Sequence, residues 1–420
     1  MPSFSHRIPG SQTPNALAAA LAARRAAGLP IINMVDSNPS RVGFERSTGP
    51  LLNPLSKPED AFYNPDPHGL PGPREALSAF YSYRMRPSDL FLCASTSEAY
   101  GWLFKLLCEP GEAVLVPKPG YPLFDFLAGL ECVEARPYSL EYIHPSGWRI
   151  DLDSLEEGLR AGKARAVVLI NPNNPTGSYV RGEEREEVVR LASKYGAALI
   201  VDEVFLGFPV EEADLLAGQT CPPQSSVAGS AAAGLPDSLA LPSFLGEERV
   251  LCFVLNGLSK LLGLPQTKLG WISVSGPAGD VRAAGSRLEI ISDTYLSAGT
   301  PVQNALPDYL SLAPDFARLA GARIRRNMSR LREVLETRDS PHRVLYCGGG
   351  WTALLEAPRI DPEEDIALAL LSECGISVQP GYYFDMPHEA YFSMSLIVEP
   401  SVFDEGLARY RAYFDKRLAD

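Results

Sequence analysis

Short apolar runs rich in β-branched residues alternate with longer helical patterns from about residue 88 onward. The runs are DLFLCAS, EAVLVP, ARAVVLI, AALIVDEVF and RVLCFVL. Apolar runs separated by helices are typical of parallel strands that are buried between two layers of helices. The pattern therefore predicts an α/β fold with a mostly parallel sheet flanked by helices.

The two ends of the chain show a different pattern. Asn15 can cap the Ala-rich run ALAAALAARRAAG, which predicts an N-terminal helix ending near Gly28. Beyond residue 300, the helical run FARLAGARIRRNMSRLREVLETR precedes short apolar segments around VLYCGGGWTALLEA, ISVQPG and YFSMSLIV. These segments predict a smaller α+β domain, and the Gly-, Ser- and Pro-rich stretch from Ala217 to Leu241 predicts a surface insertion.

Length and composition narrow the classes of function. A chain of 420 residues exceeds the usual size of one hydrophobic core, which favours two domains. A net charge of -13 argues against nucleic acid or an anionic membrane as partner and favours a small soluble ligand. Neither the seven scattered cysteines nor the five histidines have metal-ligand spacing, so no metal site is expected. With no apolar leader and no membrane-spanning run, we expect a cytoplasmic protein that does not enter the membrane.

Polar residues with catalytic potential follow four of the predicted strands. ARAVVLI leads into the irregular loop NPNNPTG at residues 171–177, and AALIVDEVF places Asp202 directly after an apolar run. RVLCFVL leads into NGLSK, which contains Lys260, and DLFLCAS leads into a helix start that carries Ser95, Thr96 and Ser97. Because ligands of open α/β sheets bind beyond the carboxyl ends of the strands, these residues are candidates for one site.

Each signal has an ordinary structural explanation as well. The carboxylate can be a helix cap, the lysine a surface charge, the hydroxyls a simple N-cap and the loop a set of turn formers. The functional interpretation requires that all four features contribute to one site. A desolvated lysine is an amine nucleophile that forms Schiff bases, and a helix N-terminus with hydroxyl groups binds phosphate.

The ordered set resembles the fold-type I enzymes that use pyridoxal 5'-phosphate (PLP), specifically the class I/II aminotransferases. The resemblance runs from about Asn15 to the C-terminus. It rests on NPNNPTG, DEVF, NGLSK followed by LGLPQTKLGW, and YNPDPHGLPGPREAL at residues 63–77. It implies a large PLP domain over residues 46–299 and a discontinuous small domain made of residues 1–45 and 300–420.

The resemblance also implies roles for individual residues. Lys260 carries PLP as a Schiff base and moves the substrate proton, and Asp202 faces the pyridine nitrogen. Asn174 hydrogen-bonds the phenolic oxygen, Tyr121 stacks on the ring, and the phosphate is held by Ser95, Thr96 and Ser97. Tyr63 matches a tyrosine that reaches the phosphate across a dimer interface, which implies a homodimer with shared active sites. Packing alone is the alternative explanation for both tyrosines.

Three positions depart from the family pattern. Phe205 stands where a tyrosine often contacts the phenolic oxygen, and Lys268 replaces an arginine on the phosphate. Ser393 lies where an arginine commonly binds the substrate carboxylate. Arg41, after the turn that starts at Ser37, is a candidate replacement, although it could equally be a surface charge. Four aromatic residues are candidates to line the pocket or to be core: Trp351, Tyr382, Tyr383 and Phe384.

The predicted function is transfer of an amino group between an amino acid and a 2-keto acid through a Schiff base on Lys260. A PLP-dependent lyase or synthase, which would use elimination, replacement or cyclisation, is the first alternative because of the missing arginine and Phe205. A PLP-binding protein without catalysis is the second alternative. The identities of the donor and of the acceptor do not follow from the sequence.

Overall fold

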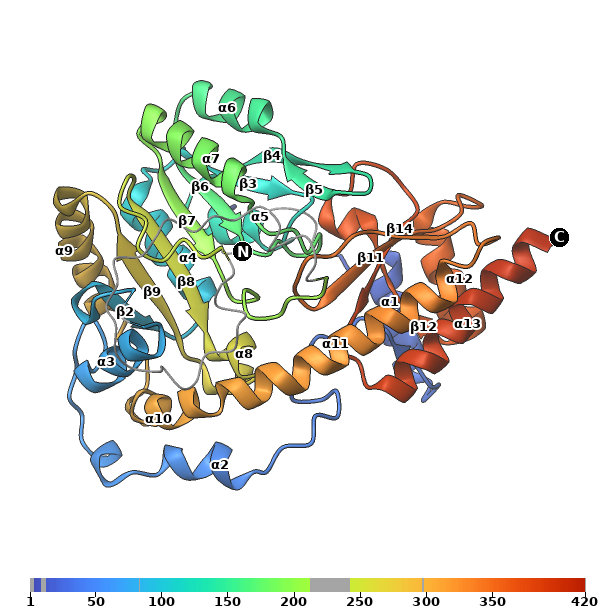
Figure 1. The fold of residues 1–420 in the computed structure, drawn as a ribbon, viewed down its shortest axis with the longest axis horizontal. Helices are drawn as coiled ribbons and strands as arrows, with labels where there is room; N and C mark the ends of the chain where they lie inside the picture. Colours follow the sequence, from blue (N-terminus) through green and yellow to red (C-terminus); the bar gives the residue numbers. More distant parts are fainter. Residues whose placement is uncertain (1–3, 9–12, 83, 212–241, 297, 420) are drawn as a thin grey trace.

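A large mixed sheet forms the centre of the protein in the computed structural model, which describes residues 4–8, 13–82, 84–211, 242–296 and 298–419 (Figure 1). The strand order is β2-β9-β8-β7-β6-β3-β4-β5. The bounds are β2 Leu90–Cys93, β3 Ala113–Lys118, β4 Glu134–Ile143, β5 Gly147–Ile150, β6 Ala164–Ile170, β7 Ala198–Asp202, β8 Cys252–Gly257 and β9 Gly270–Ser275. The five neighbouring strands β4, β3, β6, β7 and β8 are parallel to one another. Strand β5 at one end and strands β9 and β2 at the other pair antiparallel with their neighbours.

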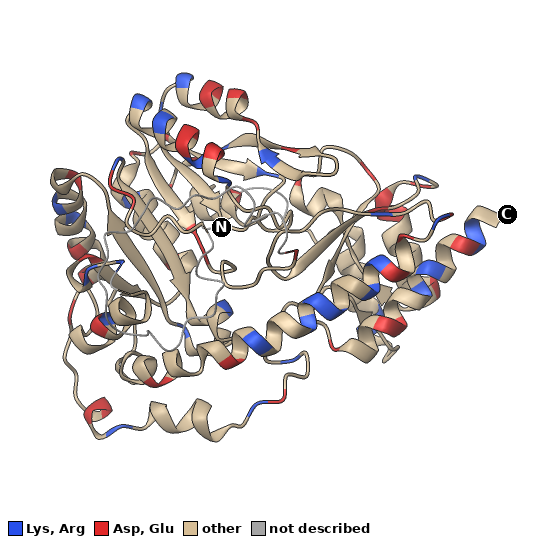
Figure 2. Ribbon diagram, viewed as in Figure 1, with Lys and Arg blue, Asp and Glu red and all other residues tan. Residues whose placement is uncertain are grey.

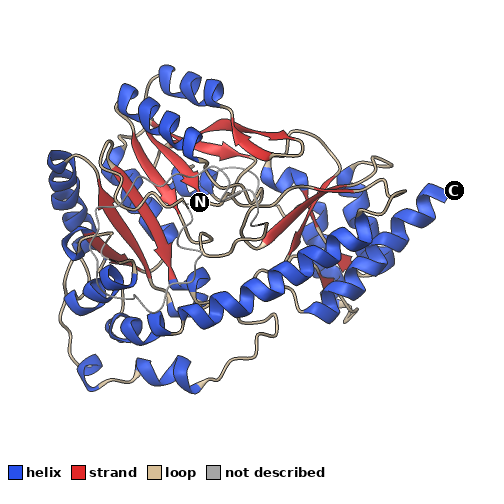
Figure 3. Cartoon of the chain, viewed as in Figure 1, coloured by secondary structure: helices blue, strands red, loops and turns tan. Residues whose placement is uncertain are grey.

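Helices cover both faces of this sheet (Figure 3). Alternate residues of β6 point to opposite faces: Ala166 and Val168 pack in one core cluster, and Val167 and Leu169 in another. The first cluster is covered by α4 Thr96–Leu107, α5 Phe124–Leu130 and α9 Ala278–Tyr295. The second is covered by α3 Pro71–Phe80, α6 Leu152–Arg160, α7 Gly182–Tyr195 and α10 Thr300–Ser311. Apolar residues on both faces explain the uninterrupted hydrophobic runs of the sequence.

A second core lies beside the large sheet. Its four-stranded antiparallel sheet has the order β10-β11-β14-β13, with β10 Arg343–Val344, β11 Thr352–Glu356, β13 Gln379–Pro380 and β14 Tyr391–Ser395. The short strands β1 Ile32–Asn33 and β12 Ile376–Ser377 pair in parallel. The helices of this core are α1 Ala16–Ala26, α11 Ala313–Leu335, α12 Glu363–Cys374 and α13 Pro400–Ala419.

Short helical segments lie between the longer helices and strands. The α-helical ones are α2 Gly49–Leu52 and α8 Leu258–Leu261; the 3₁₀ ones are η1 Asn53–Leu55, η2 Pro58–Ala61, η3 Pro87–Asp89, η5 Pro265–Thr267 and η6 Gly381–Phe384. Helix α11 runs from the neighbourhood of α8 to the small sheet (Figure 1). It therefore links the segment that carries Lys260 to the second core.

The structure confirms the predicted α/β class with its smaller α+β part, and it confirms the N-terminal helix. Asn15 caps α1 by accepting a hydrogen bond from the Ala18 backbone N–H. The proposed insertion at residues 217–241 lies outside the described residues, and the division into 46–299 and 1–45 with 300–420 stays a prediction. Charged residues lie mainly on outer helices such as α6, α7 and α11 (Figure 2). None of the helices in the described ranges has the length and apolar content needed to cross a bilayer.

Candidate active site

The carboxyl ends of four strands meet at one edge of the large sheet. Strands β6, β7 and β8 are parallel, and β2 has the same direction as β8 because both pair antiparallel with β9. Asp202 ends β7 and pairs in register with Ile170 and Leu255. Asn171, Lys260 and Ser95 follow the other three strands within a few residues. The topology thus brings together polar residues from four segments that are far apart in the sequence.

Asp202 is a buried carboxylate with two hydrogen-bond donors. Its side chain is 8% exposed, accepting from the Val204 N–H at 3.1 Å through Oδ1 and from the Tyr100 hydroxyl at 3.2 Å through Oδ2. Burial raises the pKa of this carboxyl to about 6, while the two hydrogen bonds and the charge of Lys260 act in the opposite direction. The group therefore changes its charge near neutral pH.

Lys260 lies in α8, which begins directly after β8. Burial lowers the pKa of its amine, and the charge of Asp202 offsets part of that effect. The Nζ atom lies 5.3 Å from the centre of the Phe205 ring and 5.0 Å from the centre of the Trp351 ring. A partly desolvated amine with a lowered pKa is more often neutral and hence more nucleophilic than a surface lysine.

The start of α4, where anion binding is predicted, lies at the same edge of the sheet. Ser95 is the N-cap and accepts from the Glu98 N–H at 3.2 Å, while the Glu98 carboxylate accepts from the Ala94 N–H at 2.6 Å. Gly270 of β9 is needed here, because a Cβ at that position would lie 3.3 Å from the Ser95 carbonyl carbon and 3.4 Å from the Thr96 nitrogen. Helix α4 therefore begins directly against β9. Ser97 is exposed one residue further along the helix.

Lys268 is exposed and has a left-handed backbone at the end of η5, two residues before β9 begins. It thus lies on the same side of the molecule as the start of α4. The structure gives it no hydrogen bond or ion pair among the described residues, so its amine is available.

Asn174 and Tyr121 approach the site from two loops. Asn174 is partly buried, and its side-chain oxygen accepts from the Thr352 hydroxyl of β11 at 3.4 Å. Burial and the charge of Asp202 raise the pKa of Tyr121, and its ring packs edge-on against Phe124, which also packs against Tyr100. The Gly120 N–H donates to the Phe384 carbonyl at 3.1 Å. Segment η6, with its predicted aromatic residues, therefore lies beside the Tyr121 loop.

Glu203 follows Asp202 directly, but its carboxylate holds a neighbouring loop segment of the fold. Its carboxylate accepts from the Ser243 hydroxyl and from the Phe244 N–H, each at 2.7 Å. Burial raises its pKa to about 7. The alternation of side chains along a strand sends the two neighbouring carboxylates to opposite faces of the sheet.

Trp351 forms an aromatic wall beside Lys260. Three backbone hydrogen bonds hold the run Gly348–Gly350. The Gly349 N–H donates to the Gly177 carbonyl at 2.9 Å. The Gly350 N–H donates to the Phe208 carbonyl and the Val210 N–H donates to the Gly348 carbonyl, each at 2.8 Å. These bonds place Trp351 edge-on against Phe205, with ring centres 5.4 Å apart. Trp351 is part of the core, at 1% exposure, and also a neighbour of the lysine, while its contact with a substrate stays a prediction.

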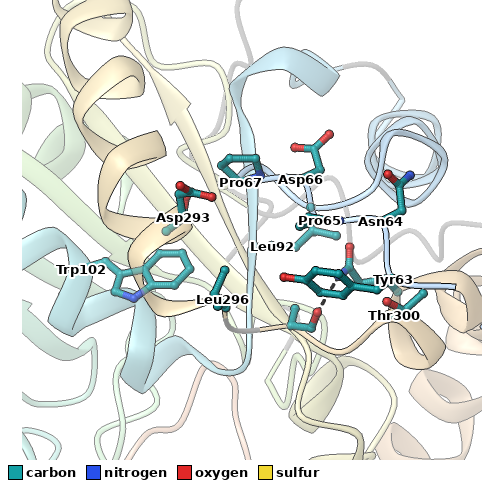
Figure 4. Close-up of a pocket in the computed structure, with 14 residues that line it drawn as sticks. Tyr63, Asn64, Pro65, Asp66, Pro67, Leu92, Trp102, Asp293, Leu296 and Thr300 are labelled. Carbon is teal, nitrogen blue, oxygen red and sulfur yellow. Dashed lines mark hydrogen bonds between the residues drawn. The ribbon is translucent and has the colours of Figure 1, made fainter.

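Tyr63 lines a surface pocket that does not include Lys260. It is 78% exposed and lines a surface pocket with Trp102, Leu296 and Thr300. Figure 4 shows Tyr63 and Thr300 at one end of this pocket and Trp102 at the other. Neither Lys260 nor Asp202 lines this pocket, so its lining does not join Tyr63 to the two central candidate residues.

The predicted substrate residues lie in two parts of the structure, an exposed turn and a buried strand. Ser37 and Arg41 are exposed on a turn whose Pro39 packs against Gly263, since a Cβ at that glycine would lie 3.0 Å from the Pro39 Cβ. This turn therefore packs against a residue that follows Lys260 by three positions in the sequence. Ser393 is buried in β14 between its partners Leu354 and Gln379.

Two residues that contact the site were not predicted from the sequence. Tyr100 donates to Asp202, and Thr352 donates to Asn174. Tyr100 lies four residues after Thr96 and hence on the same face of α4, which is the one sequence signal that could have indicated it. Thr352 is adjacent to Trp351 in sequence but gives no such signal.

Comparison with known proteins shows where this arrangement occurs. A sequence model described as aminotransferase class I and II matches residues 52–402. Nicotianamine aminotransferase 1 of Oryza sativa subsp. japonica is 29% identical over 250 residues, which cover 58% of this chain and 44% of the relative, less than half its length. Alanine aminotransferase of Mycobacterium tuberculosis is 26% identical over 376 residues, covering 86% of this chain and 80% of the relative.

Solved structures show the same fold. The alanine aminotransferase from Pyrococcus furiosus superposes with a TM-score of 0.81 at 20% sequence identity, over 99% of this chain and 100% of that one. The predicted resemblance is confirmed, and the predicted enzyme class agrees with it. The match over residues 52–402 shows that this chain belongs to the aminotransferase class I and II family.

Proposed function

We propose that this protein is a PLP-dependent aminotransferase that moves an amino group from an amino donor to a 2-keto acid. One observation carries the proposal: an amine with a lowered pKa, a buried carboxylate and a helix N-terminus meet at the carboxyl edge of one sheet. Family membership supports it.

The residues present fit PLP. The Asp202 carboxylate uses two of its roughly four lone-pair positions in the described structure, so it can still pair with a pyridine N–H. The start of α4, with Ser95, Thr96 and Ser97, is suited to the phosphate, and Lys268 adds a positive charge. Asn174 has its amide N–H groups available for the phenolic oxygen, and Tyr121 is suited to the ring face. Phe205 offers an apolar surface and no hydrogen bond at that position.

The chain's own residues hold the reactants and move the proton. When bound, PLP supplies an electron sink for the carbanion that forms as the substrate loses its α-proton. Lys260 would hold the cofactor, and its amine, whose pKa is lowered by burial, is suited to accept and return the substrate α-proton. Asp202 would pair with a protonated pyridine ring, and the rings of Trp351 and Phe205 would limit the access of water to the lysine.

The half-reaction with a single donor tests transamination against its alternatives. Purified protein with PLP and one amino acid, without a keto acid, should convert the visible absorbance completely and stably to that of the aminated cofactor. A lyase or synthase would return to the starting spectrum as product forms. A binding protein without catalysis would show no change with any donor.

Arg41 is the proposed partner of the substrate carboxylate, because the arginine expected near β14 is replaced by Ser393. Arg41→Ala should raise KM for accepted amino acids about tenfold through loss of a charge-assisted hydrogen bond, and leave KM for amines without a carboxylate unchanged. Arg25→Ala, which removes another exposed arginine, is the control. Equal KM values for amino acids in wild type and Arg41→Ala would reject this role.

A homodimer with shared active sites is part of the proposal. Phe62 and Tyr63 are 72% and 78% exposed, and Ile290 and Leu296 of the neighbouring segment are 69% and 67% exposed. An apolar surface of this kind is typical of a protein interface. Sedimentation velocity should give a mass near twice the 45.6 kDa of one chain, and a monomer at micromolar concentration would contradict the shared site.

A further inference from the structure

Tyr100 is a buried phenol whose only hydrogen bond among the described residues goes to the candidate cofactor partner. Its side chain is 2% exposed, and its hydroxyl donates to Asp202 Oδ2 at 3.2 Å. Burial and the charge of Asp202 raise the pKa of Tyr100 far above its usual value. The phenol therefore keeps its proton and acts as a donor throughout the working pH range.

The surroundings of Tyr100 fix the direction of this hydrogen bond. Phe124 packs at right angles to the Tyr100 ring with centres 5.3 Å apart, and Phe104 lies 5.9 Å away on the same helix. Phe124 also packs edge-on against Tyr121 at 6.0 Å. One aromatic cluster thus holds both the phenol that contacts Asp202 and the tyrosine suited to the cofactor ring.

The two donors to Asp202 divide its oxygens. Val204 N–H occupies one position on Oδ1 and Tyr100 one position on Oδ2, which fixes the plane of the carboxylate and leaves one lone pair on each oxygen. Two donors also favour the ionised form of a carboxyl group that burial would otherwise keep neutral. An ionised, oriented carboxylate is what a pyridine N–H requires.

We propose that Tyr100 is a positioning residue, which orients the Asp202 carboxylate and keeps it ionised for the pyridine nitrogen of the cofactor. The proposal rests on the proposed function, since it concerns the same site. Tyr100 would touch neither substrate nor cofactor and would act only through Asp202. Simple packing of a tyrosine in the core is the competing explanation.

A cofactor analogue separates the two explanations. In 1-deaza-PLP a C–H group replaces the ring nitrogen, while the phosphate, aldehyde and phenolic oxygen remain. Tyr100→Phe keeps the ring and removes the hydroxyl, so it should weaken PLP binding about tenfold and deaza-PLP binding less than about twofold. Adding Tyr100→Phe to Asp202→Asn should change PLP affinity no further, because the partner is already lost.

Tyr138→Phe is the matched control. Tyr138 is also 2% exposed, and its hydroxyl donates to the Val168 carbonyl at 2.9 Å and not to Asp202. It should lower the melting temperature about as much as Tyr100→Phe does and leave both affinities unchanged. Melting temperatures of all variants establish that the proteins compared are folded.

Each outcome decides one of the two claims. Equal weakening of PLP and deaza-PLP by Tyr100→Phe, or no weakening of either, would overturn the positioning role. A wild-type protein that binds no PLP would overturn the proposed function itself. A wild type that binds the two cofactors equally well would reject the pairing with Asp202, and the role of Tyr100 with it.

Discussion

Replacing Lys260 with alanine should lower kcat by about 10³ to 10⁴-fold, because the proton-transfer group is lost from the reacting centre. The visible absorption of lysine-bound PLP should disappear as well. The melting temperature should stay the same or rise, since the substitution removes an amine whose pKa is lowered by burial.

Lys194→Ala is the control for this substitution. Lys194 pairs with Glu156 at 2.6 Å on the surface, and such pairs contribute little to stability or to a distant site. The control should retain wild-type kcat and absorbance. Turnover of Lys260→Ala within tenfold of wild type would show that another group moves the proton.

Replacing Asp202 with asparagine should lower kcat/KM by about three orders of magnitude. A carboxylate about 4 Å from a protonated pyridine contributes roughly 4 kcal/mol at an effective dielectric constant near 20, and each ~1.4 kcal/mol is a factor of ten in rate. Asparagine keeps the shape of the side chain and can still accept a hydrogen bond from Val204, so the loss should come from the missing charge.

The pH dependence of PLP binding tests the role of the Asp202 charge. Burial raises the pKa of Asp202 to about 6 in the protein without cofactor, so the carboxylate is ionised above pH 6 and neutral below it. PLP affinity of the wild type should therefore fall as the pH drops through about 6, and Asp202→Asn should lack this step. Asp125→Asn, which changes an exposed carboxylate of α5, is the control and should keep it. Identical profiles for wild type and Asp202→Asn would contradict the role of this charge.

The residues at the strand ends were predictable because the sheet itself determines their place. Asp202, Lys260 and Ser95 each follow a run that is apolar on both faces, and parallel strands bring such ends together at one edge. The apolar pattern alone does not separate Asp202 from Glu203, because both follow the same run, and it is the family resemblance that points to Asp202. Only the alternation of the strand, seen in the structure, sends Glu203 to Ser243 and leaves Asp202 in the site.

Other features depend on tertiary contacts that no local pattern encodes. Tyr100 lies in TSEAYGWLFKLL, where an aromatic residue among apolar neighbours is typical of a helix core. Trp351 comes near Lys260 through backbone bonds between three separate loops. The strands β4, β5 and β9 were not singled out in the sequence, yet β9 supplies Gly270, against which α4 begins.

Transfer of a ¹⁵N label tests the central claim, that Lys260 is the centre of an amino-group transfer, most directly. The wild type is incubated with PLP, one ¹⁵N-labelled amino donor and an unlabelled 2-keto acid, and the amino acid formed from the acceptor is analysed by mass spectrometry. The label should appear in that amino acid with wild type and with Lys194→Ala, and be absent with Lys260→Ala. Release of the label as free ammonia, or its retention in a product of the donor skeleton, would contradict transamination.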